Sequence, residues 1–294
     1  MNQHASIART ASHLDLRHSA GFLGTEVRGI NLRDPIDAET LAELRSLLTE
    51  RLVLFFPQQN LSMPELKAFG QLWGQLEIDD SAAHVRSAED PEVVELKASV
   101  GYVADMWHTD LTPMPNPPFG SILSMKTLPE VGGDTMWASQ YAAYETLSAP
   151  IREMIENLTA LHEHPRIAER SEHPVVLVHP DSGRKCLFVN SQYTKRIPQL
   201  SQAESDALLR VLFEHSVQPP FTVRRRWNEG DIAIWDNRAT QHYVVSDFTG
   251  ERVIQRVTVK ADAIRPITSR YEDYKPQWNT LSARKDAEAV GKPG

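Results

Sequence analysis

Short runs of β-branched, aliphatic and aromatic residues, separated by glycine and proline turns, recur along most of this 294-residue chain. No single run is long enough to bury a core alone. Many short strands joined by turns, with a few helices among them, predict a mainly β fold, a jelly roll of two packed sheets with flanking helices. The runs that we interpret as strands are 22–30, 52–56, 121–125, 134–137, 175–178, 185–189, 222–227, 231–235 and 253–259.

Four segments between these runs carry helix signals. Residues 36–51 and 142–161 have apolar residues at helical spacing. A serine cap begins each of the other two. Ser62 is followed by proline and glutamate, and Ser201 is followed three residues later by Glu204 in a capping box. We expect these helices to pad the outside of the sheets.

The pattern divides the chain into a loose N-terminal arm (1–20), a single jelly-roll domain (21–276) and a polar C-terminal tail (277–294). A chain of this length readily buries a sizeable core. Residues 76–106 are acidic and irregular, and we interpret them as a solvated loop. The alternative is the mouth or lid of a site, because long loops in compact domains often carry function.

Composition and charge exclude several classes of protein. Hydrophobic residues make up 41% and charged residues 24%, which is typical of soluble globular proteins. A net charge of −8 disfavours nucleic-acid partners, and no apolar run approaches membrane-spanning length. The single cysteine, Cys186, lies in an apolar run and is expected to be buried. With no visible signal peptide, we expect a cytoplasmic protein; homo-oligomerisation stays open.

The clearest candidate site combines His108 and Asp110, in the run Trp107-His108-Thr109-Asp110, with the distant His242. Residues two apart on a strand share a face, so His108 and Asp110 can reach one ion. Two imidazoles and one carboxylate hold ferrous iron on one face and leave the opposite positions open for substrate and oxygen. If the three side chains meet, they predict an oxygen-activating iron enzyme.

The short motif alone does not identify this site, because His-x-Asp occurs three times in the chain. The other two matches are His13-Asp15, in the N-terminal arm, and His179-Asp181, in a Pro-Asp-Ser-Gly turn. Spacing alone therefore leaves open whether the triad forms. The polar residues of the Trp-Asp-Asn-Arg turn before His242 favour it, because they suit support of a metal ligand.

A second candidate is the arginine pattern near the C-terminus. Arg252, Arg256 and Thr258 share one face of a predicted strand. The pattern alone slightly favours a solvent-facing stripe on an edge strand. The alternative is a cavity in which the guanidinium groups bind carboxylates through paired hydrogen bonds. We interpret residues 224–226, three successive arginines, mainly as surface charge.

Several blocks of the sequence resemble one known family, the Fe(II)/2-oxoglutarate-dependent dioxygenases of the taurine dioxygenase family, with its alkylsulfate and aryloxyalkanoate dioxygenases. The resemblance runs from about Phe22 to Pro266, with the blocks in the family's order. The blocks are WHTD (107–110), LPEVGGDT (128–135), HPVV (173–176), HPDSGRK (179–185) and WDNRATQH (235–242).

The resemblance implies a double-stranded β-helix core and makes His108, Asp110 and His242 the ligands of Fe(II). It implies that Thr135 and Arg252 hold the far carboxylate of 2-oxoglutarate. It also implies that Arg256 lies near the acidic group of the substrate, which favours the cavity interpretation of the arginine stripe. Trp107 and Asp79 are further candidate substrate contacts.

The implied reaction is the hydroxylation of a small or medium organic anion bearing sulfate, sulfonate or carboxylate, with 2-oxoglutarate and O₂ as cosubstrates. It gives succinate and CO₂, and cleavage of a C–O or C–S bond can follow. The alternatives are a jelly-roll protein that binds a metal or small acid without turnover, and a zinc hydrolase on the same ligands.

The chain departs from the family pattern in three places. The loop between His242 and Arg252 is one residue shorter than in close relatives, and the segment between His164 and His173 is short, which implies a reduced lid. Where taurine dioxygenase binds sulfonate with a histidine and an asparagine, this chain has residues 77–79 and 103–105 instead. This last departure disfavours taurine as the substrate.

Overall fold

The computed structural model describes residues 14–78, 86, 90–98, 104–261 and 264–275. The strands are β1 Asp15–His18, β2 Thr25–Arg28, β3 Val53–Phe56, β4 Val93–Lys97, β5 Gly120–Thr127, β6 Thr135–Ser139, β7 Thr159–His162, β8 Ser171–Pro174, β9 Val176–Val178, β10 Lys185–Leu187, β11 Thr194–Arg196, β12 Thr222–Arg225, β13 Ile232–Asp236, β14 Thr240–Val244 and β15 Val253–Val259. The helices are α1 Ala38–Arg51, α2 Met63–Gln71, α3 Gln140–Glu145, α4 Ala149–Ile155, α5 Gln202–Ser216 and the 3₁₀ turn η2 Pro219–Phe221.

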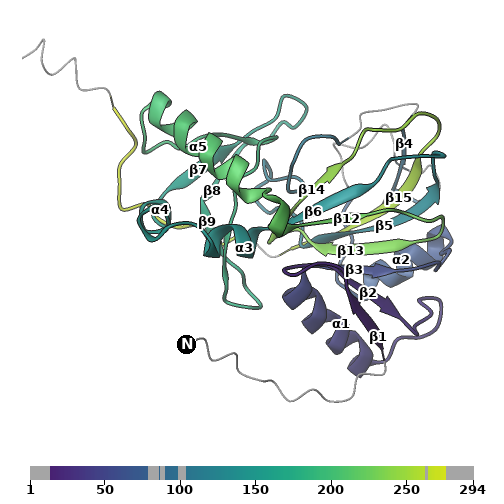
Figure 1. Ribbon diagram of the computed structural model, residues 1–294. Helices are drawn as coiled ribbons and strands as arrows, with labels where there is room; N and C mark the ends of the chain where they lie inside the picture. The colour runs from purple at the N-terminus through teal and green to yellow at the C-terminus, as the bar shows by residue number, and fades with distance from the viewer. Residues whose placement is uncertain (1–13, 79–85, 87–89, 99–103, 262–263, 276–294) are drawn as a thin grey trace, which may run out of the picture.

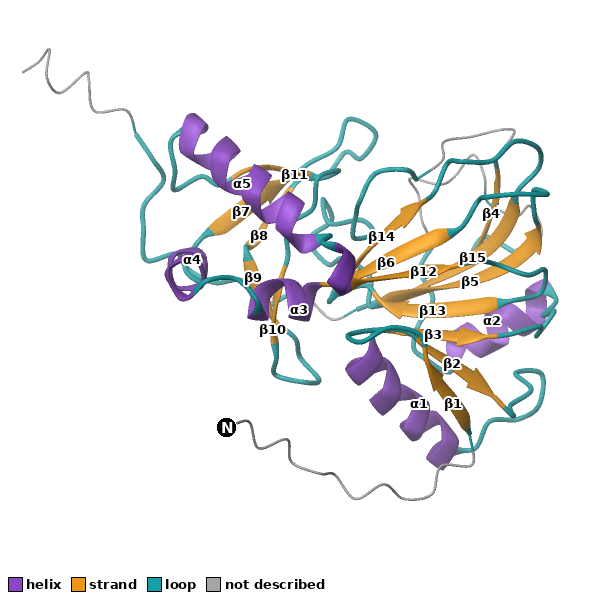
Figure 2. Ribbon diagram, viewed as in Figure 1, coloured by secondary structure: helices purple, strands orange, loops and turns teal. Residues whose placement is uncertain are grey.

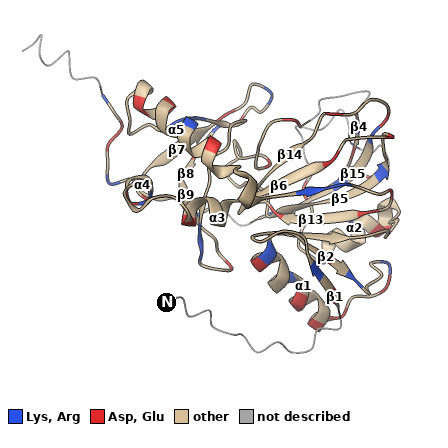
Figure 3. Ribbon diagram, viewed as in Figure 1, with Lys and Arg blue, Asp and Glu red and all other residues tan. Residues whose placement is uncertain are grey.

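The larger sheet forms the back wall of the core, with strand order β1-β2-β3-β13-β5-β15-β4. Its pairs are antiparallel except β2 with β3. Helices α1 and α2 cover the outer face of this sheet (Figures 1 and 2). Leu48 of α1 and Phe69 of α2 are buried there against Phe56 and Ile234 of the sheet. Charges of both signs mark the exposed side of α1 (Figure 3), so its apolar stripe faces the sheet.

The smaller sheet, β12-β6-β14, packs against the inner face of the larger one. Trp137 of β6 is fully buried between them and contacts Phe55 and Trp235 of the larger sheet edge-to-face. Trp227 completes the aromatic cluster. Two mainly antiparallel sheets packed face to face, with helices outside, match the predicted jelly roll.

The segment between β6 and β12 forms a separate layer at one end of the sheets (Figure 2). It contains the three-stranded sheet β11-β7-β8, the β9–β10 hairpin and helices α3 to α5 around their own apolar cluster. Our prediction of one helix over 142–161 is wrong. Ser148 and Pro150 begin a new helix, α4, and the last residues of that stretch form β7 instead.

Two further expectations require correction. β1 lies within the arm that we expected to be loose, because Asp15–His18 pairs with β2. β4 lies within the acidic segment 76–106, because Val93 and Val94 are buried and pair with β15. The C-terminal tail from residue 277 lies outside the described residues. Among the described helices, none is long and apolar enough to cross a membrane.

Candidate active site

His108 and His242 come from distant parts of the chain and are paired through their backbones. The His108 N–H donates to the carbonyl of His242 (3.1 Å), and the His242 N–H donates back (2.7 Å). Directly paired residues of antiparallel segments point their side chains to the same face. The two imidazole rings accordingly lie side by side, with centroids 3.9 Å apart.

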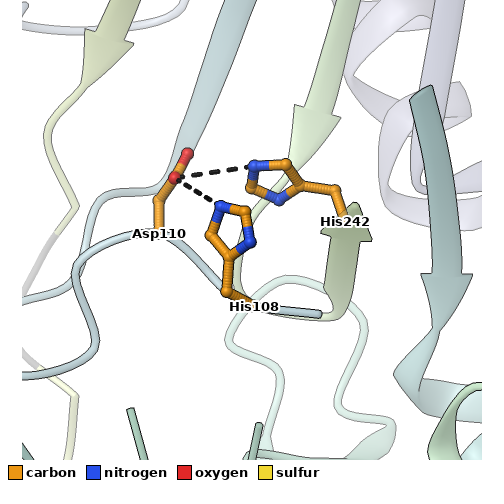
Figure 4. Close-up of side chains that lie close together, drawn as sticks. All are labelled: His108, Asp110 and His242. Carbon is orange, nitrogen blue, oxygen red and sulfur yellow. Dashed lines mark ion pairs between the residues drawn. The ribbon is translucent and has the colours of Figure 1, made fainter. Parts of the chain in front are cut away.

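Asp110 completes the group that we expected from the sequence (Figure 4). Its Oδ1 lies 3.6 Å from Nε2 of His108 and 3.6 Å from Nε2 of His242. Its Oδ2 accepts a hydrogen bond from the hydroxyl of Ser121 on β5 (3.0 Å). All three side chains are buried, so the carboxylate and both imidazoles face one enclosed point.

The segment that carries Asp110 is held by the turn before β14. Asn237 accepts from the backbone N–H of Asp110 (2.8 Å) and donates to its carbonyl (3.0 Å). The hydroxyl of Thr109 donates to the carbonyl of Thr240 (2.8 Å). Directly after Asp110, Leu111 adopts a φ of 53°, a strained conformation for a branched residue that neighbouring contacts must maintain.

The protonation states suit metal ligation. The Nδ1–H of His108 donates to the carbonyl of Met106 (2.7 Å), which leaves the Nε2 lone pair free to face Asp110. Burial lowers the pKa of His242 to about 3, with the neighbouring His108 and Arg256 adding to the effect, so its ring is neutral at pH 7. Burial by itself would raise the pKa of Asp110, but the neighbouring His242 ring and the Arg256 guanidinium together hold it well below its usual range.

This donor set fits a divalent transition metal. One nitrogen from each histidine and one oxygen of Asp110 lie within 4.8 Å of one another. Neutral imidazole nitrogen and carboxylate oxygen are ligands that iron accepts, and three protein ligands leave the other coordination positions to molecules that are not part of the chain.

A second cluster with the same residue types acts as an internal control. His179, Asp181 and Asp236 also approach one another closely. There, however, the guanidinium of Arg238 bridges Asp181 (2.6 Å) and Asp236 (2.7 Å), while His179 Nε2 donates to Asp236 (2.9 Å). Arg238 already neutralises the two carboxylates, so we interpret this His-x-Asp match as a structural ion-pair cluster and not as a metal site. The third match includes His13, which lies outside the described residues.

The structure also brings Arg252 and Thr135 together. Arg252 is buried; it donates from Nε to the carbonyl of Gly133 (3.0 Å) and from Nη2 to the hydroxyl of Thr135 (3.3 Å). Trp227 Nε1 donates to the same hydroxyl (3.0 Å). Thr135 pairs with Val244 on β14, so it lies on the same face of the smaller sheet as His242, two residues along.

Arg256 extends from the larger sheet toward the three clustered ligands. Its Nη1 lies 3.4 Å from Oδ1 of Asp110, and its side chain is 15% exposed. β15 is an interior strand, paired with both β5 and β4. The solvent-facing edge stripe, which the pattern alone favoured, is therefore wrong, and the arginines face the space between the sheets.

The remaining predictions about arginines and substrate contacts have mixed outcomes. Arg225 is no surface charge: it is mostly buried, in ion pairs with Glu26 and Asp231 (both 2.7 Å). Trp107 is half-buried and packs on Tyr243 with ring centroids 5.4 Å apart. Asp79 lies outside the described residues.

Sequence reasoning missed Ser121 and Trp227, which contact the candidate residues directly. Neither stands in a motif. Their only signals are positions within predicted strands, and those signals do not separate a site residue from a core residue. Cys186 is buried as expected, and burial raises the pKa of its thiol.

Comparison with known proteins decides the family. The family model described as "Taurine catabolism dioxygenase TauD, TfdA family" matches residues 15–258. The chain belongs to this dioxygenase family. An alkylsulfatase of Acinetobacter baylyi is 36% identical over 284 residues, which cover 87% of this chain and 88% of that protein. An alpha-ketoglutarate-dependent sulfate ester dioxygenase of Pseudomonas putida is 36% identical over 286 residues, which cover 89% and 94%.

A solved structure supports the same assignment. A taurine dioxygenase from Burkholderia xenovorans matches with a TM-score of 0.81 at 33% identity, over 90% of this chain and 96% of that chain. The predicted fold class is thereby confirmed: the two packed sheets are the jelly-roll core of this family. The family's dependence on Fe(II), 2-oxoglutarate and O₂ agrees with a His-Asp-His group that is able to bind a metal.

Proposed function

We propose that this protein is an Fe(II)- and 2-oxoglutarate-dependent dioxygenase that oxidises a small or medium organic anion. The observation that carries the proposal is the convergence of His108, Asp110 and His242 in a buried site between the sheets. In the same space lie two arginines: Arg252, which is buried, and Arg256, which is largely so. A metal site beside two cations suits a reaction that joins two anionic reactants.

The three ligands would hold Fe(II), which supplies oxygen activation coupled to the conversion of 2-oxoglutarate to succinate and CO₂. The chain's own residues bind and orient the reactants. Arg252 and Thr135 would bind the far carboxylate of 2-oxoglutarate, since a buried guanidinium and a hydroxyl are already fixed together there. Holding both ends of the cosubstrate in a site closed to water favours the productive geometry.

Arg256 would bind the acidic group of the substrate. Its guanidinium lies against Asp110, so an incoming anion competes with that carboxylate for it. Trp107, whose ring packs on that of Tyr243, remains a candidate substrate contact from the sequence. Asp79 remains a candidate contact from the sequence alone.

Sulfate esters are the first substrate class to test, because the two relatives compared above carry names for that activity. Hydroxylation of the carbon that bears the sulfate oxygen gives an unstable product, which falls apart into an aldehyde and sulfate. The oxygen atom that reaches the carbon comes from O₂, and 2-oxoglutarate supplies the remaining two electrons by losing CO₂.

A succinate-release screen tests this proposal. Purified protein with Fe(II), 2-oxoglutarate and O₂ is offered alkyl sulfates, sulfonates, aryloxyalkanoates and other carboxylates. We expect succinate in excess of the substrate-free control with at least one class, and aldehyde with the alkyl sulfates. A protein that binds the anions without releasing succinate would instead be the non-catalytic jelly-roll binder.

We further propose that residues 21–276, together with strand β1, act as one dioxygenase domain and that the enzyme works in the cytoplasm as a soluble protein. The single buried cysteine suits a reducing compartment. A net charge of −8 argues against nucleic acid as a partner. A homo-oligomer is compatible with these properties.

A further inference from the structure

The turn Gly132-Gly133 is packed between Arg252 and Asp247, which lies in the loop between β14 and β15. Both glycines adopt positive φ, 81° and 74°. A Cβ on Gly132 would lie 2.6 Å from the carbonyl oxygen of Asp247, and one on Gly133 would lie 3.2 Å from Cδ of Arg252. Only glycine allows both the conformation and the close approach.

Gly133 connects the two charged residues through its own backbone. Its carbonyl accepts from Nε of Arg252 (3.0 Å), and its N–H donates to Oδ1 of Asp247 (3.0 Å). The hydrogen bond between Asp247 and Gly133 therefore helps to fix the position of the Gly133 carbonyl. That carbonyl in turn sets the orientation of the Arg252 guanidinium. The other acceptor of Arg252, the Thr135 hydroxyl, also serves Trp227.

Asp247 is itself fixed by an ion pair on the outside of the smaller sheet. Its Oδ2 lies 3.2 Å from Nη2 of Arg224, whose Nε donates to Asp134 (2.6 Å). The backbone N–H of Val245 donates to the carbonyl of Asp134 (2.9 Å), which fixes the same loop a second time. These bonds make a chain from the half-exposed surface to the buried arginine.

Arg252 needs such support because its surroundings offer it little charge. Its hydrogen-bond acceptors among the described residues are a carbonyl and a hydroxyl, both neutral. Burial lowers its pKa to about 10, and the charge of Asp134 offsets part of that effect. A buried guanidinium held by neutral groups favours an anionic ligand. Its affinity for a planar carboxylate depends on the orientation of the guanidinium plane, because two parallel hydrogen bonds must form.

We propose that Asp247 is a positioning residue that sets Arg252 for the far carboxylate of 2-oxoglutarate, and so makes the site selective for oxo acids with two carboxylates. This inference rests on the proposed function. Asp247 and the Gly132-Gly133 turn would act only through Arg252. They would not contact the metal or the keto acid end of the cosubstrate.

Equilibrium binding of two oxo acids tests the inference without turnover. The protein, loaded with Mn(II) and kept free of oxygen, is titrated by calorimetry with 2-oxoglutarate and with 2-oxopentanoate, which has the same chain length but no far carboxylate. Asp247→Ala is compared with Asp247→Asn, which retains the Oδ1 acceptor. Glu130→Ala is the matched control, because Glu130 is exposed just before the same turn and its replacement also removes one negative charge.

We expect Asp247→Ala to weaken 2-oxoglutarate roughly tenfold, the size of one lost hydrogen bond to a charged group. Binding of 2-oxopentanoate should stay unchanged. Asp247→Asn should recover most of the affinity, and Glu130→Ala should resemble the unmodified protein. Because Asp247 is half exposed, its replacement leaves the core intact.

Two results would overturn the inference alone: undiminished binding of 2-oxoglutarate by Asp247→Ala, or an equal loss for both oxo acids, which would show a general structural defect. If the unmodified protein binds neither oxo acid, the proposed function itself fails and the inference falls with it.

Discussion

Asp110 keeps its charge in a buried place because cationic and polar groups surround it. Ser121 donates to one oxygen, and Arg256 and the two imidazoles face the other. Replacing it with asparagine retains the shape but removes the charge that a divalent ion requires. We predict that Asp110→Asn lowers Mn(II) affinity at least about 100-fold, measured by calorimetry. Asp181→Asn in the second cluster is the control; a comparable loss there would contradict the assignment of the metal site.

Asp236 illustrates a buried charge with a structural role. Burial would raise its pKa, but Arg238 and His179 overcome that effect and hold the pKa well below its usual range. The folded protein thus binds this proton more weakly than the unfolded chain does. The stability it contributes is complete above a pH of about 4 and is lost as the pH falls below that value.

The prediction for Asp236→Asn has two parts. At pH 7 the variant should lose roughly 3–5 kcal/mol of unfolding free energy, since the charge of Arg238 is left without its buried partner. Between about pH 5 and about pH 3, where carboxyl groups of the unfolded chain titrate, the stability of the variant should fall less steeply than that of the unmodified protein, because the variant lacks this carboxyl group. Urea unfolding at several pH values measures both. If the unfolding free energy of the variant depended on pH as steeply as that of the unmodified protein, the pKa of Asp236 would not be lowered in the folded state.

At the scale of elements, the turn between β13 and β14 decides where the ligands lie. Asn237 in that turn holds both backbone polar groups of Asp110, and its amide also donates to Pro118 (3.2 Å). We predict that Asn237→Ala weakens metal binding about 10- to 100-fold, although Asn237 is not a ligand. Asn228→Ala, an exposed asparagine on the preceding loop, should leave metal binding unchanged. Equal affinities in the two variants would remove the positioning role.

Local signals predicted the elements that have a strong pattern of their own, and missed strands that depend on distant partners. The caps at Ser62 and Ser201 correctly marked α2 and α5, because capping depends only on neighbouring residues. β4 was missed because its acidic sequence resembles a loop, and only pairing with the distant β15 makes it a strand. β14 was missed because it, too, depends on a distant partner: β6, with which it pairs, lies about a hundred residues earlier in the chain.

For the site, spacing alone did not separate the three His-x-Asp matches, and the family resemblance selected His108 and Asp110 with His242. The fold adds that the three side chains meet, and that Arg238 neutralises the cluster around His179. Arg252, just before β15, and Arg256, on β15, both reach the space between the sheets. Whether these side chains lie inside or outside depended on β15 being an interior strand, which no local pattern reveals.

At the scale of the whole molecule, the site is assembled from both sheets and the segment between them. His242 and Thr135 come from the smaller sheet, Arg256 comes from the larger sheet, and Asp110 lies on the connection that precedes β5. A bound ion therefore adds a further link between parts that hydrogen bonds and packing already hold together. We predict that saturating Mn(II) raises the melting temperature of the unmodified protein by several degrees, as about 3 kcal/mol of linkage would. His108→Ala should show no such shift, and an equal shift in both would place the ion elsewhere.

The most direct measurement is the amount of succinate formed per O₂ consumed by the purified protein with Fe(II), 2-oxoglutarate and an alkyl sulfate. If the site is an oxygen-activating iron centre, the two amounts are equal, both rise when the organic anion is added, and His108→Ala forms no iron-dependent succinate. Cleavage of the sulfate ester without O₂ or 2-oxoglutarate, or full succinate formation by His108→Ala, would contradict the assignment of this site.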